Sequence, residues 1–101
     1  MTSVIKKSTS ITTSIVRVRM NTFEFTAPPS GDWSALIFLF PYTDGQPISG
    51  TLMTAQKSGN DIYVLTNGIG MTPTAITQSG HTVTVTIQGS TSFRGLAITF
   101  M

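Results

Sequence analysis

The sequence predicts an all-β protein, an antiparallel, jelly-roll-like β-sandwich of about eight short strands without a significant helix. Polar and apolar residues alternate from His81 to Gln88 and again from Phe93 to Met101. This alternation is typical of half-buried strands, because successive side chains point to opposite faces of a sheet. Turn-forming pairs separate the apolar runs, among them Asp44-Gly45, Gly59-Asn60, Asn67-Gly68 and Ser79-Gly80.

The beginning of the chain divides into an arm and the start of a β-domain. Residues 2–14 are rich in serine and threonine and fit an extended arm, a first strand or the stub of a longer fibrous region. We assign residues 1–14 to an N-terminal arm and residues 15–101 to a single β-sandwich domain, since this length is common for one domain.

The first strand of that domain is expected to place Val16, Val18 and Met20 on one face. A turn or bulge at residues 21–22 then changes the parity of the apolar positions before Phe23 and Phe25.

The segment from Ala35 to Phe40 is apolar on both faces. Its shortness and the prolines on both sides of it disfavour a helix. It is expected to be a central strand of the sandwich, or a strand with one face in the core and the other in a subunit interface. In the second arrangement, Ile37 and Leu39 contact a neighbouring subunit.

Shorter strands are expected at residues 48–54, 61–66 and 74–78, followed by the two alternating terminal strands. In the last strand, one face is strongly apolar and is expected to lie in the core: Leu96, Ile98 and Phe100. The opposite face is smaller and mixed, and we expect it to meet other subunits through Phe93, Ala97 and Met101.

Charged residues are scarce. They make up 10% of the chain, whereas about 25% is usual in globular domains. Lysine, which commonly protects sheet edges, occurs only at Lys6, Lys7 and Lys57. Either the sheet closes on itself or neighbouring chains cover its edges, and we expect the second, as a homotrimer.

Composition also disfavours several classes of partner. The formal net charge is +2, and aromatic residues are not interleaved with basic ones, so no nucleic acid is expected. No stretch approaches the ~20 apolar residues of a membrane span, and the start of the chain lacks the apolar run of a signal peptide. There is no cysteine, which excludes disulfides and thiolate metal sites, and no cofactor is expected.

The ionisable side chains do not predict an enzyme. Asp32, Asp44 and Asp61 lie at expected turns, where aspartate is common because it bonds nearby backbone. No serine lies in a Gly-x-Ser-x-Gly elbow, and a single histidine, His81, makes a metal site within one chain improbable. A small hydrolase that uses Asp61 or His81 is the least favoured alternative.

Binding is the remaining class of function, because loops on rigid β-scaffolds commonly carry it. Sugar sites combine an aromatic ring with planar polar groups, and three sets of residues offer this combination: Trp33 with Asp32, Tyr42 with Asp44, and Tyr63 with Asn60 and Asp61. The structural alternative is that the aromatic residues belong to the core or its rim.

A serine- and threonine-rich arm at residues 7–14 precedes short strands with turns such as Gly59-Asn60, and the chain closes on the segment from Ser92 to Phe100. Together these features resemble the C-terminal tip of a bacteriophage tail fibre or receptor-binding protein. The resemblance implies a homotrimer, attachment to a host-surface glycan or protein, and a role of the terminal domain in trimerisation. It transfers no individual binding residue.

We therefore expect a non-enzymatic structural protein of a virion, made in the host cytoplasm without a signal peptide and acting in trimerisation and host attachment. The alternatives are a free-standing carbohydrate-binding module or lectin, and a protein that decorates a capsid.

Overall fold

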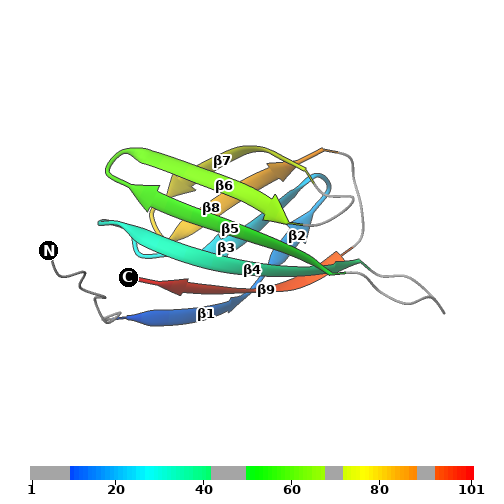
Figure 1. Cartoon of the computed structure of the whole chain (residues 1–101), viewed down its shortest axis with the longest axis horizontal. Helices are drawn as coiled ribbons and strands as arrows, with labels where there is room; N and C mark the ends of the chain where they lie inside the picture. Colours follow the sequence, from blue (N-terminus) through cyan, green and yellow to red (C-terminus); the bar gives the residue numbers. More distant parts are fainter. Residues whose placement is uncertain (1–9, 42–49, 68–71, 89–92) are drawn as a thin grey trace, which may run out of the picture.

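The computed structural model describes residues 10–41, 50–67, 72–88 and 93–101. Within these residues the chain forms nine β-strands and no helix, so no helix there could cross a membrane. The strands form two antiparallel sheets packed face to face (Figure 1). The predicted antiparallel β-sandwich is confirmed.

Sheet A is the five-stranded layer, with the strand order β1-β9-β4-β5-β6. Every neighbouring pair in it is antiparallel. The long strands β9, β4 and β5 lie in the middle, and the two edges are formed by β1 and β6. The strands are β1 (Ile11–Ile15), β9 (Phe93–Phe100), β4 (Trp33–Pro41), β5 (Thr51–Ser58) and β6 (Asp61–Asn67).

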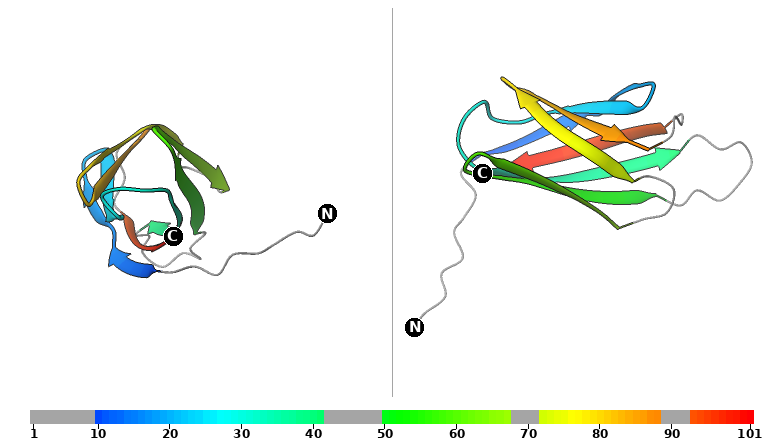
Figure 2. Two further views of the ribbon diagram at one scale, coloured as in Figure 1. Left: turned by 90° about the vertical axis from the view of Figure 1, so that its left-hand side faces the viewer. Right: turned by 90° about the horizontal axis from the view of Figure 1, so that it is seen from above.

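Sheet B is the four-stranded layer, with the strand order β2-β3-β8-β7. At one border of the sandwich β6 lies beside β7, and at the other β1 approaches β3, as the two views of Figure 2 show. The strands are β2 (Arg17–Arg19), β3 (Thr22–Thr26), β8 (Thr82–Ile87) and β7 (Pro73–Ser79).

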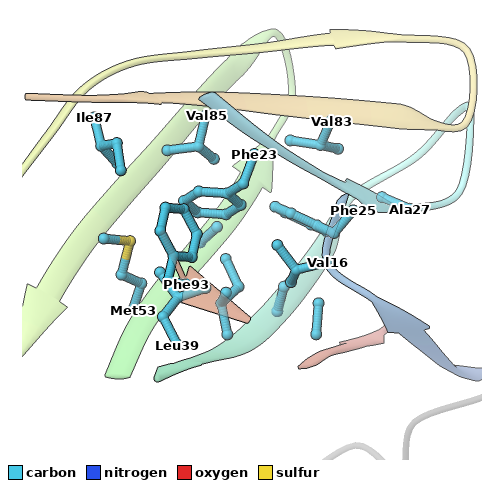
Figure 3. Packing of buried hydrophobic residues seen from close by; sticks show 14 of the residues in the cluster. Val16, Phe23, Phe25, Ala27, Leu39, Met53, Val83, Val85, Ile87 and Phe93 are labelled. Atoms are coloured by element: carbon cyan, nitrogen blue, oxygen red, sulfur yellow. The ribbon is translucent and has the colours of Figure 1, made fainter. Parts of the chain in front are cut away.

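The hydrophobic core lies between the sheets and takes one side of each long strand (Figure 3). Aromatic rings bridge the two layers edge to face: Phe23 and Phe93 have centroids 6.0 Å apart, and Phe25 and Trp33 5.8 Å. Edge-to-face pairs place the positive ring edge against the negative ring face. The buried apolar residues are Val16, Phe23, Phe25, Ala27, Trp33, Ala35, Ile37, Leu39, Met53, Ala55, Val83, Val85, Ile87, Phe93 and Ala97.

One polar contact also joins the sheets inside the core. The Thr99 hydroxyl, in a residue only 1% exposed, donates to the backbone oxygen of Thr26 at 2.9 Å. The bond satisfies a hydroxyl that would otherwise be costly to bury.

Two tight turns that the sequence indicated are present. Gly59 follows β5 with φ 63° and Gly80 follows β7 with φ 58°. This left-handed conformation favours glycine because it has no Cβ. The expected change of parity is also present, because a turn at Met20 and Asn21 joins β2 to β3. The placement of Met20 on the face of Val16 and Val18 is wrong, because Met20 lies in this turn and is 83% exposed.

Two strands depart clearly from their predicted boundaries. Residues 11–14 belong to β1 and pair with β9, so the sheet begins inside the segment assigned to the arm. Strand β5 continues to Ser58, beyond the expected end at residue 54, because Lys57 and Ser58 still pair with β6. In both cases a polar segment becomes a strand because a neighbouring strand pairs with it.

Candidate functional site

The structure separates the predicted ligand-binding residues. Trp33 is 2% exposed, and its indole Nε1 donates to the Gln78 side-chain oxygen at 3.1 Å. The Gln78 amide nitrogen in turn donates to the backbone oxygens of Pro28, at 2.7 Å, and Gly80, at 3.0 Å. The prediction that Trp33 contacts a ligand is wrong, because the side chain fills the core and its N–H already has a partner.

Asp32 ties two loops together. One of its carboxylate oxygens accepts the Gly59 amide at 2.8 Å, and the Lys57 ammonium donates to the Gly31 backbone oxygen at 3.2 Å. The two contacts connect the segment before β4 to the end of β5 and to the β5–β6 turn. Asn60 and Asp61 lie exposed in this region, whereas Tyr42 and Asp44 lie outside the described residues.

Tyr63 points away from the core, on the outer surface of sheet A, and is 58% exposed. It lies directly across from Gln56 in the β5–β6 register. A shallow groove of about 200 Å³ opens between Tyr63 and Leu65 on one side and Phe100 on the other. Its floor is made of residues from β4 and β5: Ser34, Ala35, Leu36, Thr54, Ala55 and Gln56.

The predicted subunit interface is wrong for four of its five residues. Ile37, Leu39 and Ala97 are 0% exposed and Phe93 is 3% exposed, all within the core of one chain. Only Met101, which is 43% exposed, remains accessible. The sequence reading exchanged the two faces of β9, placing Leu96, Ile98 and Phe100 inside.

One physical reason is the close approach of β4 to β9 at Gly95. A Cβ added at Gly95 would lie 2.5 Å from the Phe38 backbone oxygen and 2.7 Å from Leu39 Cδ2. At the beginning of β9, Phe93 adds a large side chain to the interior, where it packs edge to face against Phe23. Further along the strand, Gly95 and Ala97 face inwards, and Leu96, Ile98 and Phe100 lie on the outer surface of sheet A.

The outer surface of sheet A is apolar across all five strands, and we call it the apolar face. Leu36 of β4 pairs with Ile98 of β9 and with Thr54 of β5, which places all three side chains on this surface. The other pairs extend it to both edges of the sheet. Its apolar residues are Ile11, Ile15, Leu36, Phe38, Phe40, Leu52, Tyr63, Leu65, Leu96, Ile98 and Phe100.

Several of these side chains are strongly exposed: Ile15 by 80%, Leu65 by 71% and Ile11 by 69%. Charged residues of the described chain occur on this surface only near the ends of strands, Arg94 at one end of the sheet and Asp61 at the other. Five strands at about 4.8 Å spacing and eight residues at about 3.3 Å rise give the sheet surface an area of roughly 600 Å². Polar residues such as Ser34, Thr54 and Gln56 take up part of it. Contiguous apolar patches of a few hundred Å² on soluble proteins are often functional.

The outer surface of sheet B has the opposite chemistry, and we call it the threonine face. Thr82, Thr84 and Thr86 of β8 alternate with the buried valines and isoleucine of that strand. Next to them, the Arg19 guanidinium lies 3.5 Å from the Glu24 carboxylate. The remaining members of this face are Arg17, Thr22, Thr26, Ala75, Thr77 and Ser79.

No group of three or more histidine, cysteine or acidic side chains that could hold a metal ion occurs among the described residues. No protein-family model, curated protein or solved structure matches the chain. The fold and its surfaces therefore define the class, a two-layer antiparallel β-sandwich with one apolar outer face.

Sequence reasoning missed the residues that make the apolar face, above all Leu36, Leu65 and Leu96. A usable signal was present, because β4 and β9 are both apolar at odd and even positions. A strand with two apolar faces needs a second layer on its other side. The sequence did not show whether the odd- or the even-numbered residues of these two strands face the core.

Proposed function

We propose that this protein is a non-enzymatic structural module that works by assembly, burying its apolar face against another protein layer. The observation that carries the proposal is the combination of a large apolar surface with almost no charge upon it. Leaving such a surface in water costs about 25 cal/mol for each Å² of apolar area. Covering it by association removes that cost.

The setting we propose is a virion, as part of a bacteriophage tail-fibre tip that attaches to a host-surface glycan or protein. Four features of the chain support this setting: its strands are short, its tight turns contain glycine, its charge is scarce, and one of its surfaces is suited to packing. In this arrangement the threonine face remains in contact with water, because water can solvate its hydroxyls and no second protein is needed to cover them.

A pair of matched lysine substitutions tests the assembly role. Leu65→Lys introduces a charge on the apolar face at a side chain that is 71% exposed, so the single chain still folds. Thr77→Lys introduces the same charge at an exposed position of the threonine face. Circular dichroism confirms folding, and light scattering gives the mass.

We expect the unsubstituted protein and Thr77→Lys to form assemblies of the same mass at micromolar concentration, and Leu65→Lys to form smaller ones. An unsubstituted protein that stays a single chain and also fails to bind empty particles or fibre proteins of its own phage contradicts the proposal. Equal loss of association in both variants contradicts it too, because the effect then comes from net charge.

A second candidate function is carbohydrate binding, which the groove beside Tyr63 favours. An exposed aromatic ring, the Gln56 amide and the Thr54 hydroxyl line one depression, and this is the combination that stacks on and hydrogen-bonds a sugar. Tyr63→Ala abolishes glycan binding if the groove is the site. A Tyr63→Phe control retains the ring and hence most of the affinity.

A further inference from the structure

The four sheet edges of this sandwich are not equally protected. Sheet B ends on β2, which has only three residues and carries Arg17 and Arg19, and on β7, which begins with Pro73 and contains a bulge. Short length, charge, proline and bulges all prevent an edge from pairing with another chain. In sheet A, β6 begins with Asp61 and lies beside β7.

The remaining edge, β1, approaches β3 but has none of the other devices. Its sequence Ile-Thr-Thr-Ser-Ile contains no charge and no proline. Four of its five residues are exposed, with Ile11 at 69% and Ile15 at 80%. Branched residues of this kind have high β-propensity, so β1 is a strand suited to pair on both sides.

The backbone hydrogen bonds show which groups of β1 are open. The Met101 amide donates to the Ser10 oxygen at 3.1 Å, and the Val16 amide donates to the Gly95 oxygen at 3.0 Å. In an antiparallel ladder the bonded residues alternate, so the even-numbered residues of β1 bond to β9. The amides and carbonyls of Ile11, Thr13 and Ile15 therefore point away from β9, towards the open edge.

The sequence of β1 is also nearly the same in both directions. If two copies pair antiparallel with Thr13 opposite Thr13, then Ile11 of each lies opposite Ile15 of the other, and Thr12 lies opposite Ser14. All three outward-pointing residues then face outward-pointing residues, and each pair exchanges two hydrogen bonds. Any shift by one residue would set open groups against groups already bonded to β9.

We propose that the β1 edges of two copies of this chain pair antiparallel across a two-fold axis at Thr13. A two-fold contact requires a self-complementary surface, and β1 meets this in its hydrogen-bond parity and in its side chains. Because β1 carries no charge, its approach to a second β1 brings no like charges within the strand together. Main-chain bonds supply most of the affinity, as in other cases of strand addition.

The pairing joins two five-stranded sheets into one and makes their apolar faces continuous, since Ile11, Thr13 and Ile15 lie on that surface. It does not depend on the proposed function, because it uses an edge and not a face. It departs from the homotrimer expected from the sequence, because a self-complementary edge is satisfied once two copies have paired.

A disulfide tests the register directly, because the full chain has no cysteine of its own. With Thr13→Cys the two Cα atoms lie about 5.5 Å apart across the axis, within disulfide reach. In the control Thr12→Cys, also at an exposed position of β1, the two Cα atoms lie two residues out of register. That separation is about 8 Å, beyond the reach of a disulfide.

After mild oxidation at micromolar concentration, we expect most of the Thr13→Cys protein to run as a two-chain species on a non-reducing gel. The Thr12→Cys protein is expected to remain a single chain. Equal cross-linking of the two variants, or none in Thr13→Cys, overturns the proposal.

A third variant keeps this result separate from association through the apolar face. Adding Leu65→Lys to Thr13→Cys should leave the cross-link intact, since Leu65 lies on the far strand β6. A cross-link that disappears in this background shows that contact runs through the apolar face and overturns edge pairing. A cross-link that persists while face-driven association is lost supports edge pairing and leaves the assembly role to its own test.

Discussion

The two outer surfaces of this sandwich have the same backbone geometry and opposite chemistry. On sheet B the outward positions of β8 are threonines, whereas on sheet A the outward positions of β4 and β9 are mostly leucine, isoleucine and phenylalanine, with Ser34 and Arg94 near the strand ends. Both kinds of residue suit a strand, since threonine is β-branched and the others are β-branched or large and apolar. The difference is therefore one of solvation: the threonine face presents hydroxyls to water, whereas the apolar face presents mainly hydrocarbon.

The two sheets also differ in how far the local sequence shows which side of a strand is buried. Each surface alternates with the core along the same strands, so strand propensity alone does not distinguish outside from inside. On sheet B the polar alternation identifies the outer side directly. On sheet A both sides are apolar, and the packing between the sheets decides which side is buried.

The largest expected difference in unfolding free energy is between substitutions on the two sides of β9. Phe93→Ala removes a buried ring that packs against Phe23, and should cost about 3–5 kcal/mol of unfolding free energy. Leu96→Ala, at a side chain 39% exposed, should cost about 1 kcal/mol or less. Urea titration of dilute protein measures both, and the reverse order would mean that Leu96 faces the core.

Adding a single methyl group at Gly95 tests whether this residue faces the core. Gly95→Ala places a Cβ against the Phe38 backbone oxygen and Leu39, and overpacking of this kind costs about 1–3 kcal/mol. Alanine has the higher strand propensity at an exposed position, so a neutral or stabilising result would place Gly95 on the outer surface. Thermal unfolding followed by circular dichroism distinguishes these outcomes.

The smallest effect is expected on the threonine face. Glu24→Gln removes the partner of Arg19, whose side chain is 71% exposed, and exposed ion pairs contribute about 0.2–1 kcal/mol. The effect on unfolding free energy should be near the lower limit and should vanish in high salt. A loss above 2 kcal/mol that persists in high salt would show that this surface has a buried electrostatic role.

Prediction from the sequence succeeded where the pattern had one interpretation. The fold class, the turns at Gly59 and Gly80 and the final two strands followed from alternation and turn chemistry. Strand β1 was open between arm and strand, because its alternation is weak and only pairing with β9 defines it. Trp33 could not be placed, because an aromatic residue after a loop fits a binding site and a core equally well until its partner Gln78 is known.

The sequence by itself determined that this protein is built of short antiparallel strands and that its surface carries little charge, because both are set by local residue order and composition. Only the tertiary structure decided which side of β4 and β9 is buried. The reason is steric: a Cβ at Gly95 would meet the Phe38 backbone oxygen and the Leu39 side chain, so β9 turns Gly95 and Ala97 inwards and the larger Leu96 and Ile98 outwards. That choice creates the apolar face on which the proposed function rests.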